Sequence, residues 1–339
     1  MARKGAIKPR LQNAPLKGAS RITEVDKFLT DCKLELLPWQ RYVLTDMLKV
    51  DKAGKWRRKT NLCLVARQNG KTHLARIRIL AGLFIFGEMN IVAMSSNRGM
   101  ALDTFRKVVD VIEDNPHLMA QVKQIRVANG QESVELLSGA RYEIVDEDSW
   151  TAAKPITRAR PNSQIFMTSN AGDAFSTVLN DLRSRCLSYP PATMGFWEYS
   201  ADDFAKITDK DAWYQANPAL GYLIDEETIA EAIATSSVEA SRTETLCQWV
   251  SASLVAGQIQ DDGKVAVGVI AQFESQVAID ELKMAIEVNE WAMKYKPRMI
   301  CFDKYSTMSV AERLSQSGHK IQDMSGTVFY QACSDLYDA

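Results

Sequence analysis

Short apolar segments alternate with longer amphipathic segments from Lys59 onward, and this alternation constrains the fold more than any other feature. The segments read NLCLVA, THLARIRILAGLFIF, NIVAMSS and MALDTFRKVVDVIED in chain order. Such alternation is typical of an α/β domain with a parallel sheet. In IRVANGQESVELLSGARYEIV, Asn129-Gly130 and Ser138-Gly139 separate alternating segments, which predicts antiparallel hairpins added to that sheet. QIFMTSN, residues 164–170, predicts another buried strand.

The chain changes character twice after these segments. Residues 190–255 begin with Pro190-Pro191 and contain the aromatic segments FWEY and AWYQANP. An acidic start at Asp225 predicts a helix that runs to about Val255. After Gln260, KVAVGVIAQF, DELKMAIEVNEWAMKY and RMICFD predict a strand, a helix and a strand. We therefore expect a basic N-terminal arm (1–35), an α/β domain (36–190), a linker subdomain (191–255) and a second α/β domain (256–339).

Composition limits the class of protein. With 339 residues, 46% hydrophobic and 24% charged, the chain can bury a large core in two domains. No apolar run is long enough to cross a bilayer, and MARKGAIKPRLQ lacks the apolar segment of a signal peptide, so we expect a cytoplasmic protein without membrane contact. Six scattered cysteines without a C-x-x-C pair predict buried thiols and no zinc site or disulfide framework.

Positive charge is unevenly placed although the net charge is −1. The first 21 residues hold six basic residues and no acid, and KAGKWRRK covers residues 52–59. Two interpretations are open, because a charge run is found both in solvated segments and in segments that contact phosphate.

The segment LCLVARQNGKTHL, residues 62–74, predicts a phosphate-binding loop. Such a loop needs an apolar strand, a tight turn with converging amides, a lysine for the β- and γ-phosphates and a hydroxyl for Mg²⁺. LCLVA supplies the strand, Arg67, Gln68, Asn69 and Gly70 form the turn, and Lys71 and Thr72 are the lysine and the hydroxyl. Val65 stands where the usual G-x-x-x-x-G-K-[ST] pattern has its first glycine. We expect nucleotide, as ATP with Mg²⁺, to bind here.

Hydrolysis needs one acid near Mg²⁺ and a second that orients the attacking water. We assign Asp146 to the metal and Glu147 to the water, because this pair follows the apolar segment YEIV. YEIV alternates like a half-exposed hairpin strand, whereas a central parallel strand should be apolar on both faces. This conflict leads to the hypothesis that residues are missing between Val145 and Asp146.

Two further groups of polar residues extend the nucleotide hypothesis. Thr168, Ser169 and Asn170 end the next strand, where polar groups can sense the γ-phosphate and pass its loss onward. Gln40 in LLPWQRYVL precedes the first strand, and its amide, which both donates and accepts, could read the adenine edge.

Together these motifs resemble the large terminase subunit of tailed bacteriophages, particularly its HK97-like branch. The resemblance rests on LLPWQRYVL, VARQNGKT, DEDSWTAAKPITRARPNSQIFMTSNAGD and LCQWV, and covers the chain from about Leu36 to its end. It implies a P-loop ATPase of the ASCE type that moves double-stranded DNA through the portal protein into a procapsid. It also implies an RNase H-like endonuclease that cuts concatemeric DNA, a small terminase subunit as partner, a homo-oligomeric ring, expected to be a pentamer, and action in the host cytoplasm.

The resemblance also assigns residues. It implies that Arg67 responds to the γ-phosphate, and that a neighbouring subunit supplies an arginine, for which Arg98, Arg158, Arg160 and Arg183 are candidates. For the nuclease, which needs about three carboxylates around Mg²⁺ or Mn²⁺, Asp303 closes RMICFD. Asp261 or Asp262 in AGQIQDDG is the weaker candidate for a second ligand.

Three different functions would also fit parts of the sequence. A helicase-like DNA-dependent ATPase without a packaging role would need a second ATPase-like lobe after residue 200, where the chain has a short linker and an acid-tipped strand. A scaffold with an inactive nucleotide site would keep the loop without its chemistry. A protein that is chiefly a nuclease would need more carboxylates than the second domain places well.

Overall fold

The computed structural model describes residues 3–95, 97–128, 130–145, 160, 162–171, 177–188, 190–202, 205–236, 238–261, 264–275, 281–302 and 304–324. The chain forms two compact units. The first consists of residues 1–171 and 181–248, and the second consists of residues 172–180 and 249–339.

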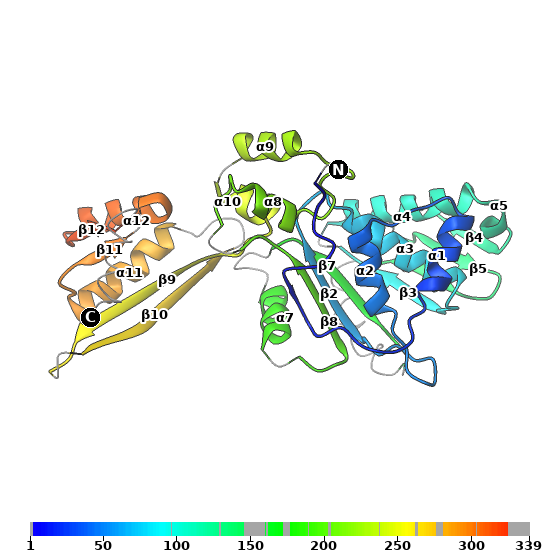
Figure 1. The fold of residues 1–339 in the computed structure, drawn as a ribbon, viewed down its shortest axis with the longest axis horizontal. Helices are drawn as coiled ribbons and strands as arrows, with labels where there is room; N and C mark the ends of the chain where they lie inside the picture. Colours follow the sequence, from blue (N-terminus) through cyan, green and yellow to red (C-terminus); the bar gives the residue numbers. More distant parts are fainter. Residues whose placement is uncertain are drawn as a thin grey trace. The chain divides into compact units, whose positions relative to one another are not determined.

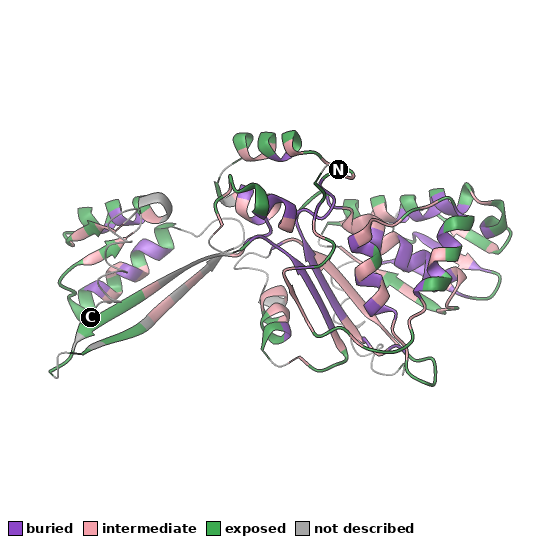
Figure 2. Cartoon of the chain, viewed as in Figure 1, coloured by how far each residue is buried: buried purple, intermediate pink, exposed green. Residues whose placement is uncertain are grey.

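A mainly parallel sheet forms the centre of the first unit (Figure 1). β2 (Thr60–Val65) lies between β7 (Ile165–Ser169) and β8 (Met194–Tyr199) and is parallel to both. The short β1 (Leu11–Gln12) adds an antiparallel edge to β8. β2 and β8 are buried along most of their length, as Figure 2 shows, because an apolar run is stable on a strand that is covered on both faces.

A second sheet in the same unit has the order β3-β6-β5-β4. β3 (Asn90–Ala93) is parallel to β6 (Arg141–Ile144). β4 (Val122–Arg126), β5 (Ser133–Leu136) and β6 pair antiparallel in succession, so the predicted hairpins at Asn129-Gly130 and Ser138-Gly139 are confirmed. The hairpins extend the sheet at β3, as expected, but the expectation of one sheet for β2 and β3 is wrong, because the two strands belong to separate sheets among the described residues.

Helices join the two sheets into one core. α3 (Lys71–Phe84) contacts β7 of the first sheet and β3 and β6 of the second. α4 (Arg98–Glu113) packs on α3, and α5 (Pro116–Met119) packs on α4. α1 (Ile22–Asp31) and α2 (Pro38–Met47) add Phe28 and Trp39 to the same buried cluster.

Residues 3–21, the first part of the predicted basic arm and called the N-terminal arm from here on, pack against the rest of the first unit. Arg58 and Asp46 form a buried ion pair beneath this arm, and Arg58 also donates to the carbonyl of Ala14 at 2.7 Å. The second basic run is likewise partly buried, since Trp56 and Arg58 are 2% and 1% exposed. Neither run is fully solvated, because Arg10 of the arm donates to Oγ of Ser200 at 2.9 Å and Arg58 of the second run pairs with Asp46.

A helical subdomain, defined as residues 201–248, follows β8. It contains α8 (Lys210–Ala216), α9 (Glu226–Thr235), α10 (Val238–Ala240) and the π-helix η1 (Ser241–Thr245) around a core that includes Trp213 and Leu246. α7 (Thr177–Leu187) precedes β8.

The helix expected from Asp225 to about Val255 is wrong in its length. Asp225 caps α9 as predicted, since its side chain accepts from the amide of Thr228, but the backbone turns extended at Ser236. Val250 already begins a strand, which is stabilised by its antiparallel pairing with the segment of residues 265–275. β8 also falls inside the stretch assigned to the linker, where the aromatic segment FWEY is buried in the sheet.

The second unit combines a long hairpin with two helices (Figure 1). β9 (Val250–Ile259) pairs antiparallel with β10 (Val265–Ser275), and β11 (Ile300–Phe302) is parallel to β12 (Ile321–Asp323). α11 (Glu281–Tyr295) and α12 (Lys304–Gln316) pack through Met284, Val288 and Leu314. The predicted strand–helix–strand order is confirmed, and both units are α/β. Among the described helices, none has the length and hydropathy needed to cross a membrane.

Candidate nucleotide site

The loop of residues 66–70 connects β2 to α3 through two left-handed residues. Gln68 has φ of 62° and Gly70, the N-cap of α3, has φ of 91°. This path leaves the backbone amides of residues 68–72 without an acceptor among the described residues. Free amides at a helix N-terminus form a site for an anion such as phosphate.

Lys71 turns back onto the strand that precedes the loop. Its ammonium nitrogen Nζ donates to the carbonyls of Val65 at 2.7 Å and Ala66 at 2.9 Å. Burial lowers the pKa of Lys71 from 10.5 to about 8, against the opposing influence of the thiols of Cys247 and Cys63. A desolvated ammonium with only neutral acceptors gains more from an anionic partner than an exposed lysine does.

Thr72 supplies a hydroxyl without a partner among the described residues. A free hydroxyl in the first turn of α3, beside open amides and a buried ammonium, has the chemistry that a magnesium triphosphate needs. The residues present therefore fit ATP with Mg²⁺.

Gln40 supports the loop from α2. Its Oε1 accepts from the amide of Leu37 at 2.8 Å, and its Nε2 donates to the carbonyl of Gly70 at 3.0 Å. The residue is 1% exposed, so its amide would have to break one of these bonds to contact a base. The structure thus assigns Gln40 a supporting contact, and reading of adenine stays a prediction.

Arg67 forms an ion pair that sequence reasoning missed. Its Nη1 lies 2.8 Å from Oε1 of Glu244 on η1, and its backbone amide donates to the carbonyl of Glu244 at 2.8 Å. The two side chains are 60% and 45% exposed. Solvent screening makes such a pair weak, so the guanidinium is available to an anion in the loop.

Asn69 is fully buried and holds the loop to the helical subdomain. Its Nδ2 donates to the carbonyl of Arg67 at 2.9 Å and to Oδ1 of Asn217 at 2.8 Å. Its Oδ1 accepts from the amide of Ala219 at 2.9 Å. Asn217 lies in the segment AWYQANP, whose residue types carry no signal of this contact.

The predicted coupling residues lie one strand from the loop. In the parallel register of β2 and β7, Thr168 is opposite Cys63 and Ser169 is opposite Leu64, and Asn170 follows directly. The structure therefore brings Thr168 and Ser169 beside the strand that leads into Arg67–Thr72.

A buried ionic group lies on the other side of β2. Glu198 of β8 is fully buried and accepts from Arg183 of α7 at 2.6 and 3.0 Å. Arg183, a candidate for action on a neighbouring subunit, is therefore paired with Glu198 within its own chain. Arg98, another candidate, pairs with Glu132 at 2.7 Å.

Two buried thiols lie near Lys71. Burial raises the pKa of Cys63 to about 12 and the pKa of Cys247 to about 12, so both thiols stay protonated.

Several predicted site residues lie outside the described residues: Asp146, Glu147, Asp262, Asp303 and Arg158. The hypothesis of missing residues between Val145 and Asp146 is likewise not tested. Asp261 is exposed in the turn between β9 and β10. In the described part of the chain, no three His, Cys, Asp or Glu residues converge in a way that could hold a metal ion.

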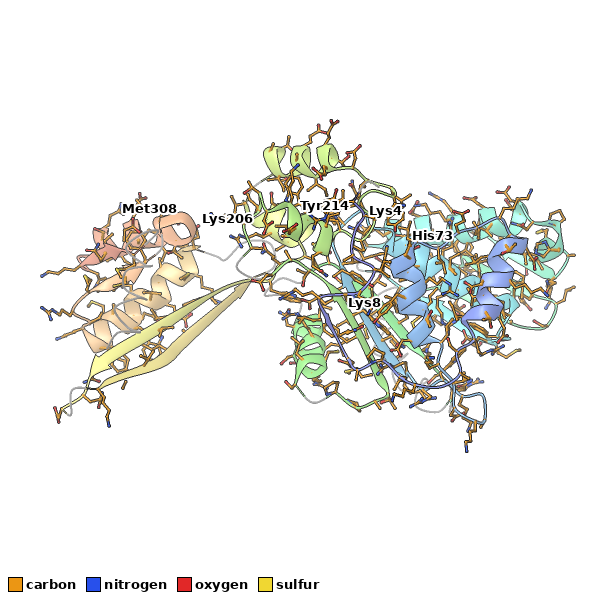
Figure 3. All side chains as sticks on the ribbon, viewed as in Figure 1. Lys4, Lys8, His73, Lys206, Tyr214 and Met308 are labelled. Atoms are coloured by element: carbon orange, nitrogen blue, oxygen red, sulfur yellow. The ribbon has the colours of Figure 1, made fainter. Side chains whose placement is uncertain are left out.

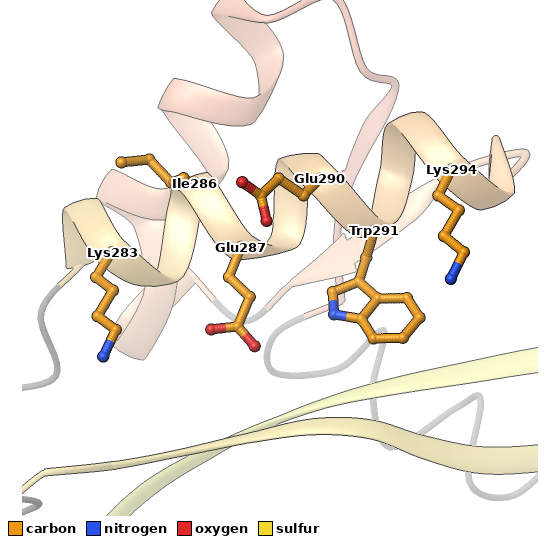
Figure 4. Close-up of a pocket in the computed structure, with 6 residues that line it drawn as sticks. All are labelled: Lys283, Ile286, Glu287, Glu290, Trp291 and Lys294. Carbon is orange, nitrogen blue, oxygen red and sulfur yellow. The ribbon is translucent and has the colours of Figure 1, made fainter.

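The second unit carries two open hollows near α11. One, of about 460 Å³, is lined by the α11 residues that Figure 4 labels, among them Glu290 and Trp291. The other, of about 330 Å³, is lined by residues that include Lys296, Arg298 and Lys320. Neither includes a residue of the phosphate loop.

The fold is that of the large terminase of bacteriophage HK97, whose crystal structure matches with a TM-score of 0.59 at 16% identity over 90% of this chain and 85% of that one. The large terminase ATPase domain of Thermus phage P74-26 and a mutant of it match with TM-scores of 0.46 and 0.48, at 12% identity over 66% of this chain and 98% of theirs. No protein-family model matches the chain, and no curated protein matches it. The expected resemblance to large terminases is confirmed, and so is a mixed α/β fold with parallel strands.

Proposed function

We propose that this chain is an ATP-driven translocase of double-stranded DNA that packages a viral genome into a procapsid. The observation that carries the proposal is the loop of residues 66–72. It combines open amides at a helix N-terminus with a buried ammonium that has only neutral partners. The shared fold with the HK97 large terminase supports the packaging role.

In this proposal the loop holds the triphosphate. The amides of residues 68–72 and the ammonium of Lys71 bind the phosphate oxygens, and Arg67 leaves Glu244 for the γ-phosphate. Thr72 and Asp146 would hold Mg²⁺, and Glu147 would orient the attacking water. Mg²⁺, when bound, supplies electrostatic stabilisation of the charge that develops in phosphoryl transfer.

Movement of DNA would follow the loss of the γ-phosphate. Thr168, Ser169 and Asn170 sense that loss beside β2, and the helical subdomain then moves against the sheet. DNA is held through its phosphates by Lys and Arg, so we expect affinity to fall steeply with salt and to be independent of sequence. The chain acts as a ring, a pentamer, on the portal protein, together with a small terminase subunit in the host cytoplasm.

The second unit is proposed to be an RNase H-like endonuclease. Asp303 would hold Mg²⁺ or Mn²⁺ beside the end of β11, with Asp261 or Asp262 as a second ligand. Cutting of plasmid DNA with Mn²⁺ tests this part separately from the motor. It should be lost in Asp303→Ala and kept in Glu312→Ala, which removes an exposed acid from α12.

DNA-stimulated ATPase activity tests the motor. We expect Lys71→Ala and Glu147→Gln to lower kcat/KM by at least about 100-fold, whereas Lys107→Ala and Glu143→Gln, which remove partly exposed members of surface ion pairs, stay near the wild type. Activity that is equal in wild type and Lys71→Ala would favour the scaffold with an inactive site. ATPase activity accompanied by strand separation would favour the helicase-like function.

A further inference from the structure

The phosphate loop and the N-terminal arm contact the same segment of the helical subdomain from two sides. This segment comprises residues 217–221, at the end of α8. Asn69 of the loop binds Asn217 and Ala219 through its side-chain amide. The amide of Gly5 in the arm donates to the carbonyl of Leu220 at 2.8 Å.

The contact between Asn69 and Asn217 is buried and uses complementary groups. Asn69 is 0% exposed and Asn217 is 1% exposed. Asn217 donates through Nδ2 to the carbonyls of Trp213 at 3.1 Å and Thr245 at 2.9 Å, while its Oδ1 accepts from Asn69. Only a side-chain amide offers an NH₂ donor and a carbonyl acceptor together in this way. Aspartate at either position would place a carboxylate oxygen, which accepts, against oxygen atoms that also accept.

Asn69 also sets the path of the loop. Its Nδ2 contacts the carbonyls of Ala66 at 3.3 Å and Arg67 at 2.9 Å. It lies between Gln68 and Gly70, the two left-handed residues that turn the loop amides outward. A change in the position of the Asn69 amide therefore changes the geometry of the amides that would meet phosphate.

The N-terminal arm packs closely against the segment of residues 217–221. A Cβ atom at Gly5 would collide with the carbonyl oxygen of Asn217. Ala6 donates to the carbonyl of Tyr214 at 2.8 Å, and the guanidinium of Arg3 lies 4.2 Å from the centre of the Tyr214 ring. Figure 3 marks this part of the arm by Lys4 and Lys8 and the subdomain by Tyr214.

We propose that Asn217 is a positioning residue of the nucleotide site, which acts through Asn69 and couples the state of the loop to the helical subdomain. Asn217 fixes the Asn69 amide, and Asn69 fixes the loop. In the reverse direction, a nucleotide that orders the loop also orders the segment 217–221. This inference rests on the proposed function, because it requires a nucleotide in the loop.

Steady-state ATPase kinetics of the full chain provide the first test, with Asn61→Ala as the matched control. Asn61 is also fully buried, and its Nδ2 donates only to backbone carbonyls, of Ile165 at 3.1 Å and Arg58 at 3.4 Å. We expect Asn217→Ala to raise KM for ATP about tenfold and to leave kcat within about twofold, because a loosened loop weakens binding of ground and transition states alike. In Asn61→Ala, KM should stay within about twofold of the wild type.

Hydrogen exchange provides a second test, and its first part uses the wild type alone. The amide of Ala219 donates to Asn69, so AMP-PNP with Mg²⁺ should slow its exchange about tenfold. In Asn217→Ala at saturating AMP-PNP, that slowing should be lost.

The outcomes separate this inference from the proposed function. If the wild type binds AMP-PNP but exchange at Ala219 does not respond, or if KM is equal in Asn217→Ala and Asn61→Ala, the role of Asn217 is refuted and the nucleotide site stands. If the wild type binds no nucleotide, both are refuted. Should Asn217→Ala not fold, the exchange measurement on the wild type decides.

Discussion

In the protein without nucleotide, the charged Lys71 side chain lowers the free energy of unfolding. Comparing the pH dependence of stability in the wild type and in Lys71→Met should reveal this effect. Burial lowers the pKa of Lys71 from 10.5 to about 8. Each pKa unit corresponds to about 1.4 kcal/mol, so keeping the desolvated ammonium charged costs about 3 kcal/mol well below pH 8. Between pH 8 and 10.5 the unfolded chain binds more protons at this residue than the folded chain, so stability rises with pH in that window.

The pH dependence isolates this effect from the lost side chain. From about pH 7 to about pH 9 the lysine contributes a gain of about 1 kcal/mol in the free energy of unfolding, which Lys71→Met lacks. The orphaned carbonyls of Val65 and Ala66 lower the stability of the variant equally at both pH values. The difference between wild type and Lys71→Met should therefore change by about 1 kcal/mol in favour of the wild type as pH rises.

Urea unfolding with EDTA and without nucleotide, at about pH 7 and about pH 9, measures this difference. Lys107→Met, on the exposed face of α4, is the control and should keep a constant difference from the wild type. A difference that is independent of pH for Lys71→Met would refute the reasoning that the ammonium is desolvated. ATP binding provides a second measurement. Because phosphate restores the charge on Lys71, ATP binding at about pH 8.5 should take up about three-quarters of a proton, as calorimetry in buffers of different ionisation enthalpy would show.

Three other substitutions test how the site is supported. Arg58→Met should lower the free energy of unfolding by about 3–5 kcal/mol, because it leaves the Asp46 carboxylate buried without its partner, and adding Asp46→Leu should recover part of that loss in chemical denaturation. Gly5→Ala should lower the free energy of unfolding by about 1–3 kcal/mol, because its Cβ would collide with backbone of the helical subdomain. A Cβ at Gly268 meets nothing within 4 Å, so thermal unfolding should show a lower stability for Gly5→Ala than for the control Gly268→Ala. Gln40→Ala should raise KM for ATP several-fold with little effect on kcat, since it removes the donor to the loop carbonyl of Gly70, and a similar loss for GTP would show that the residue supports the loop and does not read the base.

The local parts of the site could be predicted from sequence because their signals are local. The apolar strand β2, the turn and the start of α3 are adjacent in the chain, and Gly70 adopts the left-handed conformation that glycine tolerates. The partner of Asn69 could not be predicted, since Asn217 is 148 residues away in a segment with no distinctive pattern. The contacts of the N-terminal arm could not be predicted either. Its charges predict that it is solvated or contacts phosphate, whereas its backbone contacts β8 and the helical subdomain.

The segment YEIV carries two different expectations. Its alternation favours a hairpin strand, whereas the acids that follow it favour a central parallel strand. In the structure β6 meets both expectations, because it pairs antiparallel with β5 and parallel with β3 while alternate residues along it are buried. An alternating pattern therefore does not exclude a strand from an interior position beside a parallel neighbour, because one face of a sheet can be packed while the other is open.

Three of the side-chain contacts that hold the phosphate loop differ in strength, and the difference predicts which one breaks first when an anion enters. Asn69 is bound to Asn217 by a fully buried amide pair, and Gln40 binds Gly70 from an equally buried position. Breaking either leaves a buried polar group unpaired, which costs about 1–3 kcal/mol. The exposed pair of Arg67 and Glu244 is worth at most about 1 kcal/mol, and both groups return to water when they separate. Arg67 is therefore the mobile element of the loop, while Asn69 and Gln40 keep its backbone in place, so a nucleotide can redirect the guanidinium without dismantling the amides that bind it.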